Sequence, residues 1–479
     1  MVKGYIPKDQ RKKILLFCDD IRMTSGISTM AREIVIGTAQ HYNWINIGGA
    51  INHPDQGKRL DICQDTNTIV GIDDSSVYIY PISGYGTQEM VRQFIEIEKP
   101  DAIMLFTDPR YWVWLFQIEN EIRRKMPIIY LNIWDDLPAP LYNKPYYESC
   151  DTLLAISKQT KNINHLVLDE KAKDKIIAYT PHGINENHFY PINEFSPEFE
   201  KLQLERKRIL GDKEYEFVLF YNARNIRRKC VPDLIAGWSE FCDKIGQEKA
   251  AKCALLLHTQ ALDENGTDLP AVVDLICSED YKNVIINQDR LATPELNLMY
   301  NLADAVTLVS SNEGWGLSLT EGLMCGKMIT ATVTGGMQDQ MRFEDASGNW
   351  IDFTKEFPSN HFGTYKNHGE WAVPIYPSNM SLVGSIPTPY IWDDRADFRD
   401  IAKAIETIYE LSPEERQKRG MAGRKWVQSD ESMMSARMMG ENIINKIDDT
   451  FKTWKPRKEY EFIKTEKIQK KSIVHPLTY

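Results

Sequence analysis

The chain has 479 residues, which is more than one hydrophobic core accommodates, so its length predicts two domains. Hydrophobic residues make up 42% and charged residues 26%, an ordinary composition for a globular protein. The formal net charge of −11 argues against a general nucleic-acid binder, although it does not exclude a local basic channel.

The eight cysteines form no C-x-x-C pair, so they predict neither a metal site nor a redox motif. Several lie in or beside apolar runs, as buried structural cysteines do. Residues 1–13 are polar and lack the apolar centre of a signal peptide, and no apolar run is long enough to span a membrane. Together these features predict a cytoplasmic protein.

Short apolar runs and amphipathic stretches alternate through the first part of the chain. Strands are predicted at 14–17, 44–47, 77–80, 102–106, 128–133 and 152–156, and helices at 28–35, 88–97 and 111–124. This alternation predicts a doubly wound parallel sheet. A turn-rich stretch at 180–185 and a polar linker at 191–212 are expected at the end of this first domain, residues 1–192.

The same alternation restarts after the linker. Strands are predicted at 217–221, 254–258, 284–286, 305–309 and 328–331, and helices at 231–241, 294–301 and 317–325. A second Rossmann-like α/β domain is therefore predicted over 193–430, with the two sheets facing a cleft. Residues 431–479 are predicted to be a helix and a basic tail that cross back to the first domain.

Several familiar phosphate motifs are absent from both halves of the sequence. Without G-x-G-x-x-G or G-x-x-x-x-G-K-[ST], a dinucleotide oxidoreductase and a P-loop NTPase are poorly supported. Without a D-x-D triplet, the usual metal clamp for a diphosphate is missing. A bound diphosphate would then be neutralised by protein cations and helix N-termini, so neither a metal nor a cofactor is predicted.

A cationic segment follows the first strand of the second domain. The stretch 221–229 contains Arg224, Arg227, Arg228 and Lys229 between a predicted strand and a predicted helix. Open α/β sheets bind ligands at the carboxyl ends of their strands, where arginine and lysine can hold a pyrophosphate. The alternative is a solvated basic loop.

An acidic, glycine-rich segment lies at 310–322 and contains Glu313 and Glu321, eight residues apart. Glycines let backbone N–H groups approach a ligand, and ionised carboxylates accept hydrogen bonds from sugar hydroxyls. Either glutamate alone could be a helix-capping acid. The turn at Gly335 and Gly336 is expected to close the same sheet edge.

With these segments the chain resembles the retaining GT-B glycosyltransferases of the family-four type, also called glycosyl transferases group 1. The E-x7-E pair of that family matches Glu313 and Glu321, and its Arg-x4-Lys motif matches Arg224 and Lys229. Its turn before the second domain matches residues 181–185. The resemblance covers most of the chain.

The resemblance implies a donor site in the second domain. Arg224 and Lys229 would hold the donor diphosphate, Glu321 the ribose, and Glu313 the transferred sugar. The stretch between the glutamates would also contact the donor, through Gly314, Trp315, Gly316, Leu317 and Thr320. Transfer would retain the anomeric configuration by front-side attack, with the departing diphosphate deprotonating the acceptor. Unlike a glycosidase, such an enzyme needs no carboxylate pair flanking the bond.

The resemblance also implies two first-domain features. The loop of Ser25, Gly26 and Ile27 matches the family's glycine loop, with a serine in place of its first glycine, and would leave room for the donor phosphate and the acceptor. Trp134 stands where the family often has a histidine before an aspartate. Asp135 then either orients the acceptor or sugar, as a catalytic residue, or caps its loop.

Two segments keep alternative interpretations. The aromatic insert at about 340–395 covers the donor, contacts the acceptor or packs on the surface. The tail after Lys452 is basic and contains aromatic residues, so it binds nucleic acid or a membrane surface, or forms a solvated extension of the last helix.

The nucleotide-sugar donor and the acceptor remain unidentified by sequence, as does the oligomeric state. Polysaccharide, lipid-linked sugar, protein and small metabolite are all compatible acceptors. A modified DNA base is an alternative that the acidic net charge disfavours. A catalytically inactive GT-B scaffold and a sugar epimerase of the same fold are alternative functions.

Overall fold

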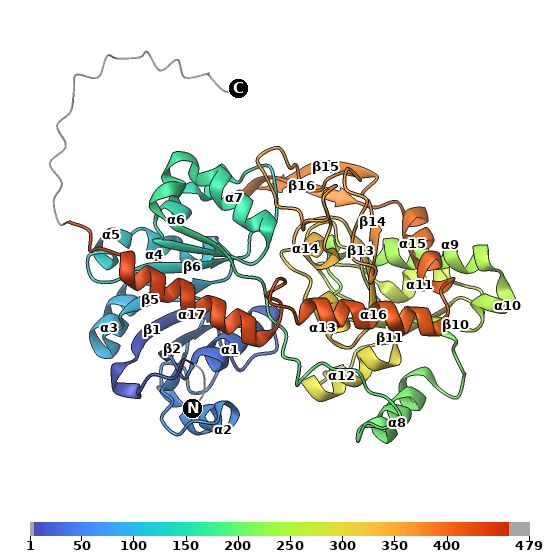
Figure 1. Ribbon diagram of the computed structural model, residues 1–479, viewed down its shortest axis with the longest axis horizontal. Helices are drawn as coiled ribbons and strands as arrows, with labels where there is room; N and C mark the ends of the chain where they lie inside the picture. Colours follow the sequence, from blue (N-terminus) through green and yellow to red (C-terminus); the bar gives the residue numbers. More distant parts are fainter. Residues whose placement is uncertain (1–3, 459–479) are drawn as a thin grey trace, which may run out of the picture.

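The computed structural model describes residues 4–458 and consists of two α/β domains, each built around one parallel sheet (Figure 1). The first sheet has the strand order β3-β4-β2-β1-β5-β6-β7-β8, and only β3 is antiparallel to its neighbour. Its strands are β1 Lys12–Asp19, β2 Tyr42–Gly49, β3 Leu60–Asp61, β4 Val77–Pro81, β5 Ala102–Phe106, β6 Ile128–Asn132, β7 Thr152–Ala155 and β8 Ile176–Tyr179. Central strands such as β5 are buried along their length, which explains their continuous apolar runs.

Helices cover both faces of this sheet (Figure 1). They are α1 Gly26–Thr38, α2 Cys63–Val70, α3 Gln88–Glu98, α4 Val113–Phe116, α5 Glu119–Ile122, α6 Lys144–Glu148 and α7 Lys158–Leu168. The single helix expected at 111–124 is instead a 3-10 turn, Pro109–Trp112, followed by α4 and α5. The break after α4 allows both Phe116 and Ile122 to pack into the core.

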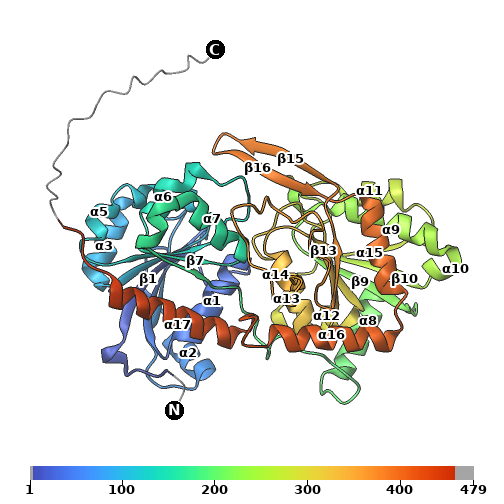
Figure 2. The same ribbon diagram turned by 45° about the horizontal axis from the view of Figure 1, so that its top comes forward.

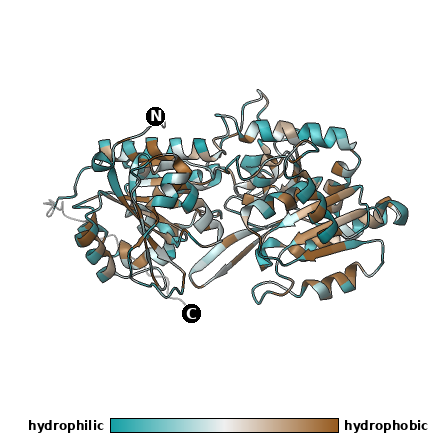
Figure 3. Ribbon diagram, turned by 90° about the horizontal axis from the view of Figure 1, so that it is seen from below, coloured by the Kyte–Doolittle hydropathy of each residue, from teal (hydrophilic) through white to brown (hydrophobic). Residues whose placement is uncertain are grey.

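The second sheet has the order β11-β10-β9-β12-β13-β14, and all its strands are parallel. They are β9 Phe217–Asn222, β10 Cys253–His258, β11 Asn283–Asn287, β12 Ala305–Leu308, β13 Met328–Thr332 and β14 Ala372–Ile375. Apolar strands fill the centre of each domain, with polar residues towards the outside (Figure 3). The prediction of two parallel α/β sheets is confirmed.

The helices of the second domain are α8 Phe199–Leu210, α9 Val231–Ile245, α10 Gln247–Ala250, α11 Leu269–Ile276, α12 Thr293–Leu302, α13 Leu317–Met324, α14 Met337–Met341, α15 Phe398–Tyr409 and α16 Pro413–Val427. Helix α8 corrects the linker expected at 191–212. It packs on α12 and β11 because Leu202 and Leu210 form a buried stripe among its charged residues.

Both sheets reverse their direction of winding at one point. In the second domain the chain adds β10 and β11 on one side of β9 and then returns to place β12 on the other. In the first, β2 and β5 flank β1 in the same way. Open α/β sheets bind ligands at the carboxyl ends of the strands at such a switch point, so the β9 and β12 ends locate the candidate site.

The aromatic insert ends in a two-stranded hairpin, β15 Asn379–Ser385 and β16 Thr388–Arg395, which lies beside the junction between the domains (Figure 2). Before the hairpin, the aromatic side chains of the insert pack mainly on one another, around Phe343, His361 and Tyr376. The insert therefore both packs within the second domain and extends to the first.

The chain crosses between the domains twice, and the two crossings pair with each other. The Ile184 N–H donates to the Met434 carbonyl at 2.9 Å, and the Ala436 N–H donates to the Ile184 carbonyl at 3.0 Å. Helix α17, Ala436–Thr453, then lies along the first domain against α1 (Figure 1). Beyond it, Arg457 bonds Glu119 of that domain at 2.6 Å. The tail lysines from 464 onward lie outside the described residues. Within residues 4–458, no helix has the length and apolarity needed to cross a membrane.

Candidate active site

Two cations stand where β9 ends. Arg228 and Lys229 belong to a 3-10 turn, Arg227–Lys229, between β9 and α9. The next residue, Cys230, has a left-handed backbone (φ 51°) that redirects the chain into the helix. This turn buries Lys229 and leaves 42% of the Arg228 side chain exposed.

Glu313 follows β12, the neighbour of β9, and lies against these cations. Its carboxylate bonds Lys229 Nζ, and one oxygen lies 3.1 Å from Arg228 Nη1. Ser310 donates a further hydrogen bond of 3.2 Å. Burial by itself would raise the pKa of Glu313, but the two cations outweigh it and lower the pKa to about 2. The carboxylate is therefore ionised at any physiological pH.

The loop after β13 supports the Glu313 loop from behind. The Gly336 N–H donates to the Glu313 carbonyl at 3.0 Å. A Cβ on Gly335, which has φ 51°, would lie 2.0 Å from that same oxygen, so only glycine fits. The predicted closure of this sheet edge by a third loop is thus present in the structure.

Two of the residues predicted to contact the donor turn their side chains into the domain. The Trp315 indole donates to Thr320 Oγ1 at 3.0 Å, and Thr320 donates to Gln340 at 2.7 Å. Both residues are buried. The hydrogen-bonding groups of both side chains are therefore engaged within the domain.

Glu321 lies one helical turn into α13 and is buried without the cations that surround Glu313. Tyr300 of α12 donates its hydroxyl to this carboxylate. Asn222, at the end of β9, donates to the same hydroxyl oxygen at 3.0 Å. Burial raises the pKa of Glu321 to about 7, and the Tyr300 hydrogen bond opposes the rise.

The first domain meets this loop directly. A Cβ on Gly314 would lie 2.9 Å from the carbonyl oxygen of Ile133, so the junction is closed at this point. Asp135 and Asp136 follow Ile133 and remain partly exposed. Burial raises the pKa of both carboxyls. Their mutual repulsion raises that of Asp136 further, while the Arg228 charge opposes both shifts. Asp135 therefore lies close enough to Arg228 and Glu313 for both charges to affect its pKa, and its role stays a prediction.

The predicted glycine loop also reaches the junction. Ser25 accepts the Ser28 N–H as the N-cap of α1 and donates to Asp19 at 2.6 Å. A Cβ on Gly26 would lie 3.3 Å from Leu317, the first residue of α13. Ile27 packs on the hydrophobic core. The loop thus places the start of α1 opposite the start of α13, where Gly316 (φ 85°) opens the helix.

Arg224 is not brought together with the other site residues. Its guanidinium pairs with Asp263 at 2.7 Å, and 61% of the side chain is exposed. Arg228, rather than Arg224, is the arginine that lies with Lys229 against Glu313, and the role of Arg224 at the donor diphosphate stays a prediction. The loop bends after Arg224, and Asn225 is anchored to the carbonyl of Thr267 at 2.7 Å. Arg228 lies in the predicted cationic segment, but no sequence signal ranks it above Arg224, and no motif assigns a role to Tyr300, Asn222 or Asp136.

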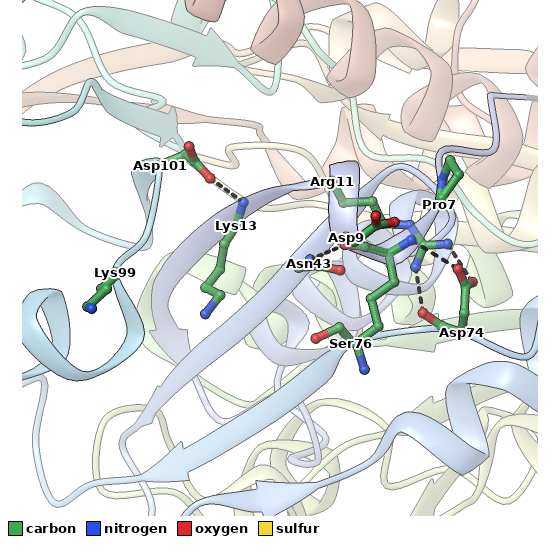
Figure 4. Close-up of a pocket in the computed structure, with 10 residues that line it drawn as sticks. Pro7, Asp9, Arg11, Lys13, Asn43, Asp74, Ser76, Lys99 and Asp101 are labelled. Atoms are coloured by element: carbon green, nitrogen blue, oxygen red, sulfur yellow. Dashed lines mark hydrogen bonds and ion pairs between the residues drawn. The ribbon is translucent and has the colours of Figure 1, made fainter.

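A separate hollow lies at the opposite, amino-terminal end of the first sheet (Figure 4). Several of its charged groups have partners: Arg11 bonds Asp74 at 2.6 Å, and Asp101 accepts the Lys13 N–H at 2.9 Å. It lies away from the strand ends that carry the candidate site. Within residues 4–458, no group of three His, Cys, Asp or Glu side chains is arranged to hold a metal ion.

Residues 205–356 match the family model described as glycosyl transferases group 1, a range that contains the cations and both glutamates. The matched range lies within the second domain. The chain is thus an enzyme of the glycosyltransferase class, and the structure places the most prominent charges of the group 1 domain at its β9/β12 switch point. No curated protein sequence matches the chain.

Solved structures show that the group 1 domain and its partner domain together form a GT-B fold. The Anabaena protein HepE, solved with UDP and glucose, matches with a TM-score of 0.61 at 11% identity, covering 92% of this chain and 100% of that one. A sucrose-phosphate synthase from Thermosynechococcus elongatus matches at 0.62 and 15%, covering 92% and 100%. A glycosyltransferase from Rickettsia africae matches at 0.59 and 14%, covering 93% and 100%.

Proposed function

We propose that this enzyme transfers a sugar from a nucleoside diphosphate sugar to an acceptor, with retention of anomeric configuration and without a bound metal. The observation that carries the proposal is the contact of buried Glu313 with buried Lys229 and half-exposed Arg228, at the switch point of a domain that matches the group 1 model. The similar fold of HepE, solved with UDP-glucose, supports a nucleotide-sugar donor.

The cluster provides the positive charge that a metal ion would otherwise supply to a bound diphosphate. Phosphate oxygens would take over the hydrogen bonds of Lys229 and Arg228, and the positive N-terminal end of α13 faces the same space. Glu313, released from those cations, would accept hydrogen bonds from the sugar. Charge that develops on the leaving phosphate is then stabilised by groups already in place.

The proposed chemistry needs no protein nucleophile. The bond from the anomeric carbon to the diphosphate breaks while a bond to the acceptor oxygen forms on the same face. The acceptor proton passes to the departing phosphate oxygen. Asp135 and Asp136 would accept hydrogen bonds from acceptor hydroxyls, which orients the attacking oxygen.

The charged groups at the junction argue against two alternatives, a modified DNA base as acceptor and an inactive scaffold. Two adjacent acids at the junction would repel the phosphodiester backbone of DNA, so a modified DNA base is not favoured. A scaffold without activity would have no need of buried, oppositely charged groups at the switch point, since replacing such groups by apolar residues is often stabilising.

Thermal-shift screening of nucleotide sugars, followed by NMR of the product's anomeric proton, tests the proposal. A donor should raise the unfolding temperature, because it binds only the folded state. The product should keep the donor's anomeric configuration, and EDTA should not reduce the rate. Glu313→Gln should reduce transfer at least a hundredfold. An inverted product, or full activity in Glu313→Gln, would contradict the proposal.

A further inference from the structure

The two glutamates of the E-x7-E pair differ in how their charge is balanced. Glu313 has two cations beside it, whereas among residues 4–458 no lysine or arginine pairs with Glu321. Glu321 is nevertheless buried, with 8% of its surface exposed. A buried carboxylate that must accept ligand hydroxyls needs a hydrogen bond that favours its ionised form.

Tyr300 supplies that hydrogen bond, and the surrounding structure fixes its direction. Asn222 donates to the Tyr300 oxygen at 3.0 Å, so the phenolic proton points to Glu321. The Tyr300 ring is held edge-on by Phe220, with centroids 5.0 Å apart, and by Phe189 at 5.7 Å. The ring has no freedom to turn away, because Tyr300 is fully buried.

We infer that Tyr300 and Asn222 are positioning residues that hold the Glu321 carboxylate for the ribose of the donor, and so make the enzyme select ribonucleotides over 2′-deoxyribonucleotides. The inference rests on the proposed function. A site built to hydrogen-bond a hydroxyl discriminates strongly against a ligand that lacks it, because the buried polar group is then left unpaired.

This arrangement makes donor binding depend on pH near neutrality. With its pKa at about 7, Glu321 is partly protonated at pH 7, and the protonated form is the weaker acceptor for two hydroxyls. Binding of a ribose should therefore release a proton. The groups facing Glu321 are the Tyr300 hydroxyl and the Cys325 thiol, whose own pKa is raised by burial, so neither titrates in this range.

The test is calorimetric binding of UDP, GDP and ADP to the full chain, followed by the 2′-deoxy form of the tightest ligand. Tyr300→Phe should weaken binding about tenfold at pH 7 and reduce the preference for ribose. It should also shift the acid limb of the affinity to higher pH, because the pKa of Glu321 rises without the hydrogen bond. Asn222→Ala, which keeps the tyrosine, should act in the same direction less strongly.

Tyr42→Phe is the matched control. Tyr42 is also buried and donates to a carboxylate, Asp448, at 2.7 Å, but it lies at the start of β2, far from the site. Tyr42→Phe should leave both affinity and pH profile unchanged. If Tyr300→Phe does not fold, Asn222→Ala decides the question.

The outcomes separate the inference from the proposed function. Normal binding with unchanged affinity, ribose preference and pH profile in Tyr300→Phe and Asn222→Ala overturns the inference alone. Failure of the wild-type chain to bind any of the three nucleotides overturns the proposed function, and this inference with it.

Discussion

The two sides of the domain junction differ in which charges surround their carboxylates. On the second domain, Glu313 is neutralised by Lys229 and Arg228, which arise from the end of the adjacent strand. On the first domain, burial raises the pKa of the consecutive acids Asp135 and Asp136, Asp135 raises that of Asp136 further, and Arg228 from across the junction lowers both.

This difference suggests a division of labour. The charge cluster of the second domain is formed by residues of that domain alone. The acids of the first domain depend in addition on Arg228 of the second domain, which lowers the pKa of both. In terms of the proposed function, the donor side is therefore built into one domain, whereas the acceptor side draws on both.

The largest effect should come from breaking the second-domain cluster. Lys229→Met should lower kcat/KM about a thousandfold, since it removes a charge that stabilises the leaving phosphate. It should also cost about 3 kcal/mol in the free energy of unfolding, because Glu313 remains buried with one cation fewer. Steady-state kinetics and urea denaturation measure the two losses.

The double variant Lys229→Met/Glu313→Gln is the control, and it should recover most of the stability but none of the activity. Folding lowers the pKa of Glu313 from 4.5 to about 2, so the cluster stabilises above pH 4.5 and its contribution disappears as the pH falls towards 2. A Lys229→Met protein with wild-type stability at pH 7 would show that Lys229 does not stabilise the buried charge of Glu313.

An intermediate effect should follow removal of the first-domain acids. Asp135→Asn and Asp136→Asn should each lower kcat about ten- to a hundredfold while changing the affinity for donor less than twofold, because in the proposed function these side chains orient the acceptor. Asp55→Asn, a surface acid paired with Lys58 at 2.7 Å, serves as the control. Equal losses of donor affinity and kcat would contradict the proposal that the first-domain acids act on the acceptor rather than on the donor.

The smallest effect is expected at Arg224. Arg224→Ala should change donor affinity less than twofold, because that side chain is exposed and paired with Asp263. Arg228→Ala should weaken donor binding at least tenfold. Titration of both variants with the same nucleoside diphosphate compares them directly. If Arg224→Ala weakens donor binding more than Arg228→Ala does, Arg224 must leave Asp263 to bind the donor.

The parts of the molecule that follow from local pattern were predictable from sequence. Buried parallel strands appear as continuous apolar runs, and Glu313 and Lys229 follow such strands directly, so both the fold and this pair could be located. The choice between Arg224 and Arg228 was not predictable, because it depends on how a loop bends against Thr267. Tyr300 was equally hidden, since a tyrosine in a helix has no motif to distinguish it from the core.

The insert shows the same limit. Its aromatic content is evident from the sequence. The hairpin, however, bonds Leu137 and Tyr142 of the first domain, some 250 residues away in the sequence, and local periodicity cannot predict such a contact. Strand β14 was missed because it is short and lies at the sheet edge.

The hairpin has a consequence for the catalytic cycle. The Trp392 N–H donates to Leu137 of the first domain at 2.7 Å, and two residues later Asp394 bonds Ser311 and Thr334 of the second. One strand thus ties the acceptor-side loop to the loop preceding Glu313. If the proposed reaction requires the two domains to separate, these hydrogen bonds would have to break first, and the rate at which they break would then set an upper limit on turnover.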